Sequence, residues 1–222
     1  PGFLKPEDLL VFNNTKVIPA RFFGSMEGHT TEVEILLVRE IRPHVFCCIG
    51  RPLKRFKVGR AIEFKAGLSG VIRERVSEKE VLVEFVSGDP AESIEDLLRQ
   101  DGTMPIPPYI RSGHGDDEDR RDYQTIFAEI DGSIAAPTAS LHFTPELMGA
   151  LHVRGCAAEF LTLHVGTASF LPLPYDEDKG FSPPGEEEFF VPPELLDSVR
   201  ACRARDGRVI PVGTTAVRAI ES

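Results

Sequence analysis

The chain has no tryptophan, few cysteines and no long apolar run. A helix needs about 20 apolar residues to cross a membrane, so the sequence predicts no such span and no membrane partner. The four cysteines lack the Cys-x-x-Cys spacing of metal or redox sites: Cys47 and Cys48 are adjacent, while Cys156 and Cys202 stand alone. This pattern favours buried packing thiols in a reducing, cytoplasmic compartment.

Positive charge is also scarce: the chain contains 25 Lys and Arg residues and 35 Asp and Glu residues, which gives a net charge of −10. This balance argues against indiscriminate nucleic-acid binding, but it leaves room for a folded RNA held by a local basic patch. A cluster of five cations within residues 51–60 consists of Arg51, Lys54, Arg55, Lys57 and Arg60. Such a cluster is typical either of phosphate binding or of a solvated barrel loop.

The first half of the chain has the pattern of short β-strands. Residues 8–12 predict a buried strand that turns at Asn13-Asn14. Several short apolar or alternating runs follow between about residues 24 and 88, which indicates a small β-barrel. The predicted strands are 32–35, 45–49, 61–64 and the two strands of a hairpin, 71–76 and 81–86. A short helix is then expected over 93–100, with Ser93 as its cap.

The second half alternates between helix and strand. Thr144 and Pro145 begin a helix that Gly155 ends, and residues 156–165 predict a strand. A helix over 193–205, a strand over 208–212 and a final helix after Gly213 follow. This alternation predicts an α/β domain with a mixed or parallel sheet, made of residues 1–23 and 101–222. The β-barrel, residues 24–100, would be inserted into it, and we expect the α/β domain to continue beyond Ser222.

Two histidines among small or apolar residues are the candidate catalytic groups. His164 shares a strand face with Thr162 and lies at the carboxyl end of the predicted strand, where ligands collect in open α/β sheets. His142 precedes the Thr144 cap, at the mouth of a helix. The alternatives are a core histidine bonded to a backbone carbonyl and a local capping or packing role. Neither histidine has a partner at metal-ligand spacing, so we expect no metal.

Three other segments carry polar or aromatic side chains in turns. Gly213-Thr214-Thr215 forms a strand-to-helix turn that suits a carboxylate or a ribose, or acts only as a helix cap. Residues 104–109 form a stiff, proline-rich segment, either a hinge or a platform that offers Tyr109 for stacking. Residues 116–119 are all acidic and predict an exposed loop.

Taken in order, these motifs make the chain resemble one family, the S-adenosylmethionine:tRNA ribosyltransferase-isomerases of queuosine biosynthesis. The resemblance covers nearly the whole chain and implies an α/β domain with an inserted β-barrel. The motifs that carry it are residues 8–21, 51–55 and 105–110, Tyr123-Gln124, Ala135-Ala136-Pro137-Thr138, Leu141-His142-Phe143-Thr144, Leu163-His164-Val165-Gly166, and Gly213-Thr214-Thr215 through Arg218.

The resemblance implies a reaction. Members of the family transfer the ribosyl part of S-adenosylmethionine to the 7-aminomethyl-7-deazaguanine base of a tRNA and isomerise it, giving epoxyqueuosine-tRNA, adenine and methionine. The sulfonium acidifies the adjacent ribose carbon, so one group must remove a proton and another must assist the departure of adenine. The implied site residues are His142 and His164 for proton transfer, in unknown order; Thr138, Tyr109, Gly166, Gly213, Thr214 and Thr215 for S-adenosylmethionine; and Arg51, Lys54 and Arg55 for RNA phosphates.

The chain departs from the family pattern at three places. Ser140 replaces a glycine, and Ala168-Ser169-Phe170 replaces Gly-Thr-Phe. Residues 181–188 replace a His-x-Met-His-x-Glu segment: acidic residues are retained, both histidines are lost, and we expect Glu186 to Glu188 to replace the segment functionally. Two alternative functions therefore stay open: a non-catalytic S-adenosylmethionine-binding paralogue, and ribosyl transfer to a non-tRNA amine. We expect a monomer or a weak homo-oligomer.

Overall fold

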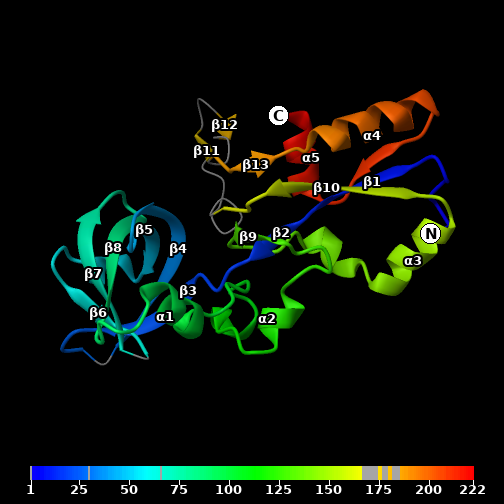
Figure 1. Cartoon of the computed structure of the whole chain (residues 1–222). Coiled ribbons are helices and arrows are strands. Elements are labelled where there is room, and N and C mark those ends of the chain that lie inside the picture. The colour runs from blue at the N-terminus through cyan, green and yellow to red at the C-terminus, as the bar shows by residue number, and fades with distance from the viewer. Residues whose placement is uncertain (1, 30, 66, 167–174, 177–179, 182–185) are drawn as a thin grey trace. The chain divides into compact units, whose positions relative to one another are not determined.

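The computed structural model describes residues 2–29, 31–65, 67–166, 175–176, 180–181 and 186–222 (Figure 1). The chain divides into two compact units: Pro1–Ile18 with Arg121–Ser222, and Pro19–Arg120. The first unit contains a mixed sheet with helices, and the second contains a closed six-stranded barrel, which confirms the predicted fold class. The predicted insert, 24–100, lies inside the second unit, which also includes residues 19–23 and 101–120.

The main sheet of the α/β unit has the strand order β13-β10-β1-β14. Strand β1 (Leu9–Asn13) is central and pairs in parallel with β10 (Ala157–Leu163) and β14 (Val209–Pro211). Strand β13 (Phe189–Phe190) runs antiparallel to β10. The carboxyl ends of the three parallel strands therefore lie at one edge of the sheet, and β13 begins at that same edge.

Shorter strand pairs complete this unit. Strand β2 (Thr15–Val17) pairs in parallel with β9 (Ile130–Ser133), which brings two distant segments together beside the end of β1. Strands β11 (Tyr175–Asp176) and β12 (Gly180–Phe181) form a separate antiparallel pair. The departures from the family pattern at residues 168–170 and 182–185 lie outside the described residues.

Helices cover both faces of the main sheet. Helices α4 (Pro193–Ala204) and α5 (Thr214–Glu221) contribute Leu195, Cys202 and Ala219 to the apolar cluster on one face, together with Leu161 and Leu163 of β10. Helix α3 (Pro145–Val153) contributes Leu151 to the cluster on the other face. The predicted alternation of side chains along β10 is therefore confirmed. It follows from the two-residue period of a strand.

The caps that the sequence predicts are present. The Thr144 hydroxyl accepts a hydrogen bond from the backbone N–H of Leu147 at 3.2 Å, and Pro145 occupies the first turn of α3. In the barrel unit, the Ser93 side chain accepts from the N–H of Asp96 and begins α1 (Ile94–Asp101). These side chains satisfy amide groups that have no partner within the helix.

The barrel closes in the order β3-β4-β5-β8-β7-β6, with every neighbouring pair antiparallel. Phe22, Phe64 and Phe85 form an aromatic cluster among these strands. Strand β4 is longer than predicted, because register shifts after Leu37 and Glu40 interrupt the alternation on which the prediction rests. The strands are β3 (Arg21–Met26), β4 (Glu32–Arg42), β5 (Val45–Arg51), β6 (Ala61–Glu63), β7 (Leu68–Arg75) and β8 (Glu80–Ser87).

A buried arginine fixes the segment that follows α1. The Arg21 guanidinium donates to the carbonyl oxygens of Ile106 and Gly113, at 2.6 and 2.8 Å, and pairs with Glu34 at 3.1 Å. Short helices η1 (Leu53–Arg55), η2 (Arg111–Gly113) and α2 (Asp119–Asp122) also lie in or next to this unit. A buried guanidinium needs such partners, so Arg21 holds this loop against the barrel.

The four cysteines are free and buried. Burial raises the pKa of the Cys47 and Cys48 thiols, which keeps them protonated and unreactive. The predicted packing role is therefore confirmed for these two. Among the described residues, no helix is long and apolar enough to span a membrane.

Candidate active site

Polar side chains gather where the parallel strands of the main sheet end. Asn13 closes β1, and its side-chain amide donates to the carbonyl of Leu163 at 2.9 Å. The Asn13 side-chain oxygen accepts from the N–H groups of Leu163 and Thr15, at 3.0 and 3.1 Å. Asn13 therefore joins β1 to β10 at the edge where His164 and Gly166 follow.

His164 is held by a hydroxyl and not by a backbone carbonyl. Its Nδ1 lies 2.8 Å from the Oγ1 of Thr15, a buried residue, while the imidazole itself is half-buried. Within the described residues, Nε2 of this ring has no hydrogen-bond partner. The alternative of a core histidine bonded to a carbonyl is thus wrong. The ring presents one nitrogen that can exchange a proton with a ligand.

Gly132 gives the imidazole its space. A Cβ added at Gly132 would lie 2.8 Å from the His164 ring. The backbone φ of Gly132 is +148°, a conformation that residues other than glycine rarely adopt. The neighbouring Ser133 hydroxyl accepts from the N–H of Val165 at 2.7 Å, and the N–H of Ile134 donates to Val165 O at 3.0 Å. The segment that follows β9 therefore runs directly beside the end of β10.

The acidic run Glu186 to Glu188 contributes one buried carboxylate. Glu187 accepts a hydrogen bond from the N–H of Gly166 at 2.8 Å, and Arg218 of α5 donates to its second oxygen. The Glu187 side chain is only 6% exposed, whereas Glu186 and Glu188 are exposed. Glu187 is therefore the member of the run that belongs to this edge of the sheet.

The start of α5 adds free amides and hydroxyls. Gly213 has φ +91°, and a Cβ placed on it would lie 3.1 Å from Ala139, so the turn packs closely on helix η3 (Thr138–His142). Among the residues that the structure describes, no side chain caps α5. The buried hydroxyls of Ser140 and Thr215 have no partner among the described residues. Because an unpaired buried hydroxyl is costly, these two atoms mark places for a ligand or an ordered water.

The remaining predicted residues of this unit lie at its surface. Thr138 and Thr214 are exposed, at the start of η3 and of α5. His142 ends η3 and is exposed, and it forms no hydrogen bond with His164 in the described part of the chain. The pairing of the two histidines in one cleft remains a prediction.

The other predicted residues belong to the barrel unit. Tyr109 is 86% exposed, Arg51 and Lys54 are exposed, and Arg55 is half-buried in η1. None of these three cations forms an ion pair within the ranges that the structure covers. Among described residues, no group of three or more His, Cys, Asp or Glu side chains is arranged to hold a metal ion.

Sequence reasoning did not single out Thr15, Glu187 or Arg218 as a connected set. Thr15 and Arg218 lie within motifs that the family pattern marks, so the signal was present for both. The contact between Thr15 and His164 joins residues 149 positions apart, which no local pattern reveals.

The fold defines an α/β protein with a cluster of polar side chains at its strand ends and a second unit that contains a closed β-barrel. A family model described as "Queuosine biosynthesis protein" matches residues 1–222. The chain belongs to this family.

Named relatives agree with this assignment. The chain is 43% identical over 240 residues to the S-adenosylmethionine:tRNA ribosyltransferase-isomerase of Caulobacter vibrioides, covering 100% of this chain and 65% of the relative. It is 43% identical over 225 residues to the enzyme of that name from Sphingopyxis alaskensis, covering 100% and 62%. The chain thus spans slightly less than two thirds of the length of these relatives.

A solved structure is also similar. The crystal structure of S-adenosylmethionine tRNA ribosyltransferase from Thermotoga maritima is 27% identical, with a TM-score of 0.34. The match covers 99% of this chain and 56% of that one.

Proposed function

We propose that the protein transfers and isomerises the ribosyl part of S-adenosylmethionine onto the 7-aminomethyl-7-deazaguanine base of a tRNA in the cytoplasm. The names of the relatives support the reaction class. The observation that carries the proposal for this chain is the imidazole of His164, which Thr15 contacts through Nδ1, while Nε2 has no hydrogen-bond partner among the described residues. An imidazole in that arrangement suits general acid-base catalysis.

His164 and His142 take the two proton roles in this proposal, in unknown order. Thr15 orients the His164 ring, so Nε2 is the atom that gains or loses the proton. Gly132 allows the ring to lie in this position, because a side chain there would collide with it. Glu187, paired with Arg218, holds the backbone of Gly166 beside the ring and supplies the acidic group of the lost family segment.

The residues of this unit also fit S-adenosylmethionine. The uncapped start of α5 offers amide groups to a carboxylate, as helix N-termini commonly do. The unpartnered hydroxyls of Ser140 and Thr215 suit the hydroxyl and amino groups of a ribose or a methionine. Thr138, Thr214, Gly166 and Gly213 would complete this set. The bound molecule supplies an acidified ribose carbon and two leaving groups.

Contacts to the base and the RNA fall to the barrel unit in this proposal. Tyr109 is exposed and would stack on adenine or the modified base. Arg51, Lys54 and Arg55 would bind RNA phosphates, since none of them is engaged in an ion pair among the described residues. S-adenosylmethionine acts as the ribosyl donor and no metal is required.

The test is an assay for adenine. The protein is mixed with S-adenosylmethionine and with tRNA that carries the deazaguanine precursor, and released adenine is measured. Release that requires this tRNA supports the proposal. Binding of S-adenosylmethionine without release would overturn it in favour of a non-catalytic paralogue. Release that is independent of RNA would overturn the tRNA substrate and favour a small-molecule amine.

A further inference from the structure

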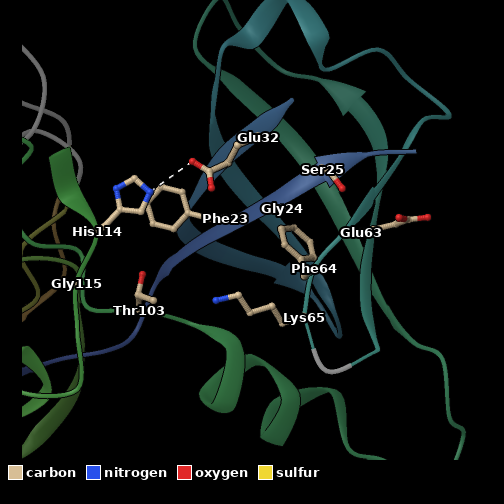
Figure 2. A pocket seen from close by; sticks show the side chains of 10 residues that line it. All are labelled: Phe23, Gly24, Ser25, Glu32, Glu63, Phe64, Lys65, Thr103, His114 and Gly115. Carbon is tan, nitrogen blue, oxygen red and sulfur yellow. Dashed lines mark ion pairs between the residues drawn. The ribbon is translucent and has the colours of Figure 1, made fainter. Parts of the chain in front are cut away.

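The barrel unit contains a cavity of about 430 Å³ that none of the site residues above lines. All of its lining residues belong to Pro19–Arg120. Pockets for small organic molecules have volumes of about 300–1,000 Å³, so this one has room for a single nucleotide. Figure 2 shows its lining: Phe23, Gly24, Ser25, Glu32, Glu63, Phe64, Lys65, Thr103, His114 and Gly115.

An aromatic stack forms part of the wall. The rings of Phe23 and His114 lie 4.0 Å apart and are within 10° of parallel. Phe64 also lines the cavity and packs in the aromatic cluster with Phe22 and Phe85, which fixes its position. Flat aromatic surfaces of this kind bind unstacked nucleobases, because every base has a π-face.

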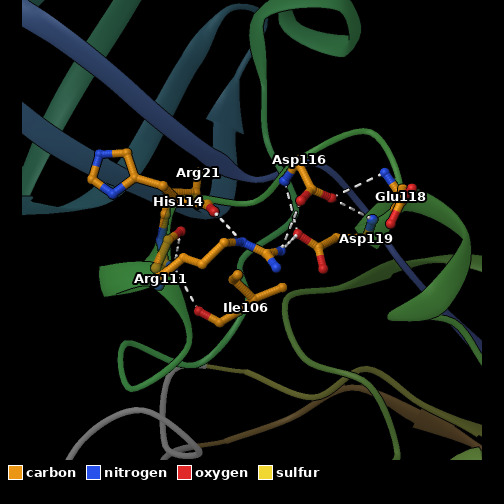
Figure 3. Close-up of polar contacts among 8 residues, drawn as sticks. Arg21, Ile106, Arg111, His114, Asp116, Glu118 and Asp119 are labelled. Atoms are coloured by element: carbon orange, nitrogen blue, oxygen red, sulfur yellow. Dashed lines mark hydrogen bonds and ion pairs between the residues drawn. The ribbon is translucent and has the colours of Figure 1, made fainter.

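The loop that presents His114 is braced before any ligand arrives. Arg111 donates from Nε to the His114 carbonyl at 3.3 Å and pairs with Asp116 and Asp119 (Figure 3). The preceding residue, Gly113, accepts from the buried Arg21. The acidic loop 116–119, predicted as exposed, thus serves to hold Arg111. Such bracing lowers the entropy lost on binding.

The polar groups of the cavity select a type of base. Glu32 lies 3.4 Å from Nε2 of His114 through one carboxylate oxygen, which leaves the second oxygen as an acceptor (Figure 2). A carboxylate accepts hydrogen bonds and donates none, so it suits a base edge with adjacent N–H donors. Guanine presents such an edge through N1–H and its exocyclic amino group. Lys65 lines the same cavity and forms no ion pair within the described residues, which suits a phosphate.

We propose that this cavity binds one unstacked guanine-type nucleotide of an RNA. The base stacks on the outer face of the Phe23–His114 pair, Glu32 accepts from its N–H edge, and Lys65 contacts a phosphate. This inference rests on the proposed function, because it assumes that the protein meets RNA. It adds a base-reading site on the barrel unit, distinct from the residues assigned to the transferred ribose.

The probes are uridine-rich single-stranded oligoribonucleotides that carry one guanosine or one inosine, together with free guanosine 5′-monophosphate. Inosine lacks the exocyclic amino group. Binding to the whole chain is measured by calorimetry, and NMR shifts of His114 locate the site. We expect the guanosine oligonucleotide to bind about tenfold more tightly than the inosine one. It should also bind more tightly than the free nucleotide.

Variants complete the experiment. Glu32→Gln should remove most of the tenfold preference for guanosine, and His114→Ala should weaken binding of both oligonucleotides about fivefold or more. Glu95→Gln is the matched control, because Glu95 pairs with His44 at the same 3.4 Å outside the cavity. It should change neither value.

Three results would overturn the inference. They are equal binding of guanosine and inosine oligonucleotides, an unchanged preference in Glu32→Gln, and free guanosine 5′-monophosphate binding as tightly as the oligonucleotide. Adenine release without guanosine binding would remove this site and leave the proposed function intact. Guanosine binding at His114 without adenine release would support this site and overturn the proposed function.

Discussion

The two units of the molecule differ in where they bury polar groups. Among the described residues, eight polar or charged residues are buried as a whole, and the barrel unit contributes only Arg21. The other seven belong to the α/β unit: Asp8, Asn13, Thr15, Thr125, Ser133, Ser140 and Thr162. A closed barrel satisfies its backbone through its own strand pairs, whereas an open sheet leaves its strand ends to side chains. The buried polar residues therefore lie almost entirely in the α/β unit, where we propose that the chemistry takes place.

The two units also differ in how far apart their partners are in sequence. Most of the barrel pairs join strands that follow one another along the chain. The site residues of the α/β unit meet over much greater separations, as in Thr15 with His164 and Asn13 with Leu163. The barrel is thus built from local pairing, while the site requires the whole α/β unit to be folded.

The largest predicted effect tests whether the barrel has its own core. Phe22 is fully buried among Phe64 and Phe85, so Phe22→Ala should cost about 3–5 kcal/mol of unfolding free energy. Amide hydrogen exchange should rise in the barrel strands and stay unchanged in β1 and β10. An equal rise in both units would show that they share one cooperative core.

The next effect concerns activity and not stability. Gly132→Ala should displace the His164 ring and reduce the rate of adenine release about 100-fold, because the added Cβ meets the imidazole at 2.8 Å. Gly149→Ala is the control, since a Cβ there meets nothing within 4 Å. Activity near that of the unchanged protein in Gly132→Ala would remove the positional argument for His164.

Acid sensitivity should distinguish the sheet from the barrel. Hydrogen bonds from Arg208 lower the pKa of the buried Asp8 carboxyl, and these bonds join β1 to β14. The folded-state pKa lies below the unfolded value of about 3.9, so this stability is fully present above the unfolded pKa and is lost as the pH falls from there through the folded-state pKa.

Asp8→Asn should therefore cost about 1–3 kcal/mol at neutral pH and reduce the loss of stability on acidification. Chemical denaturation at a series of pH values measures both effects. Asp197→Asn serves as the control, because its pair with Arg200 is exposed and should contribute less than about 1 kcal/mol. Parallel pH profiles for Asp8→Asn and the unchanged protein would contradict the role of this pair.

The smallest effect concerns the basic cluster on the barrel unit. Replacement of both Lys54 and Arg55 by Ala should lower the slope of log affinity for tRNA against log salt by about 2, about 1 for each phosphate contact. Lys79→Ala, on the exposed β7–β8 turn, should leave the slope unchanged. A slope that persists in the double variant would assign the cluster to a solvated loop.

Local chemistry explains which parts of the fold the sequence predicted. The Ser93 and Thr144 caps, the β7–β8 hairpin and the alternation along β10 depend on neighbouring residues, so their patterns are visible in the chain. The position of His164 at the carboxyl end of β10 was predicted for the same reason. Closure of the barrel between β3 and β6 requires residues far apart to pair, and no local pattern reports it.

The contacts of the candidate site were predicted less completely, because they are long-range. The sequence singled out His164 as a candidate, and that role stays a prediction; its contact with Thr15 and the pair of Glu187 with Arg218 depend on tertiary structure. The hydroxyl of Ser140 is buried without a partner among the described residues, and this burial becomes visible only in the folded chain. The cavity at Phe23 and His114 carries no motif, since the two rings come from segments that fold together only in the barrel unit.

The most direct measurement is adenine release by a His164→Ala variant, in the presence of S-adenosylmethionine and tRNA with the deazaguanine precursor. A proton-transfer role predicts a fall of about 100- to 10,000-fold in rate. His152→Ala, an exposed histidine of α3, should keep the original rate. Full turnover by His164→Ala would contradict the assignment of this imidazole to the chemistry.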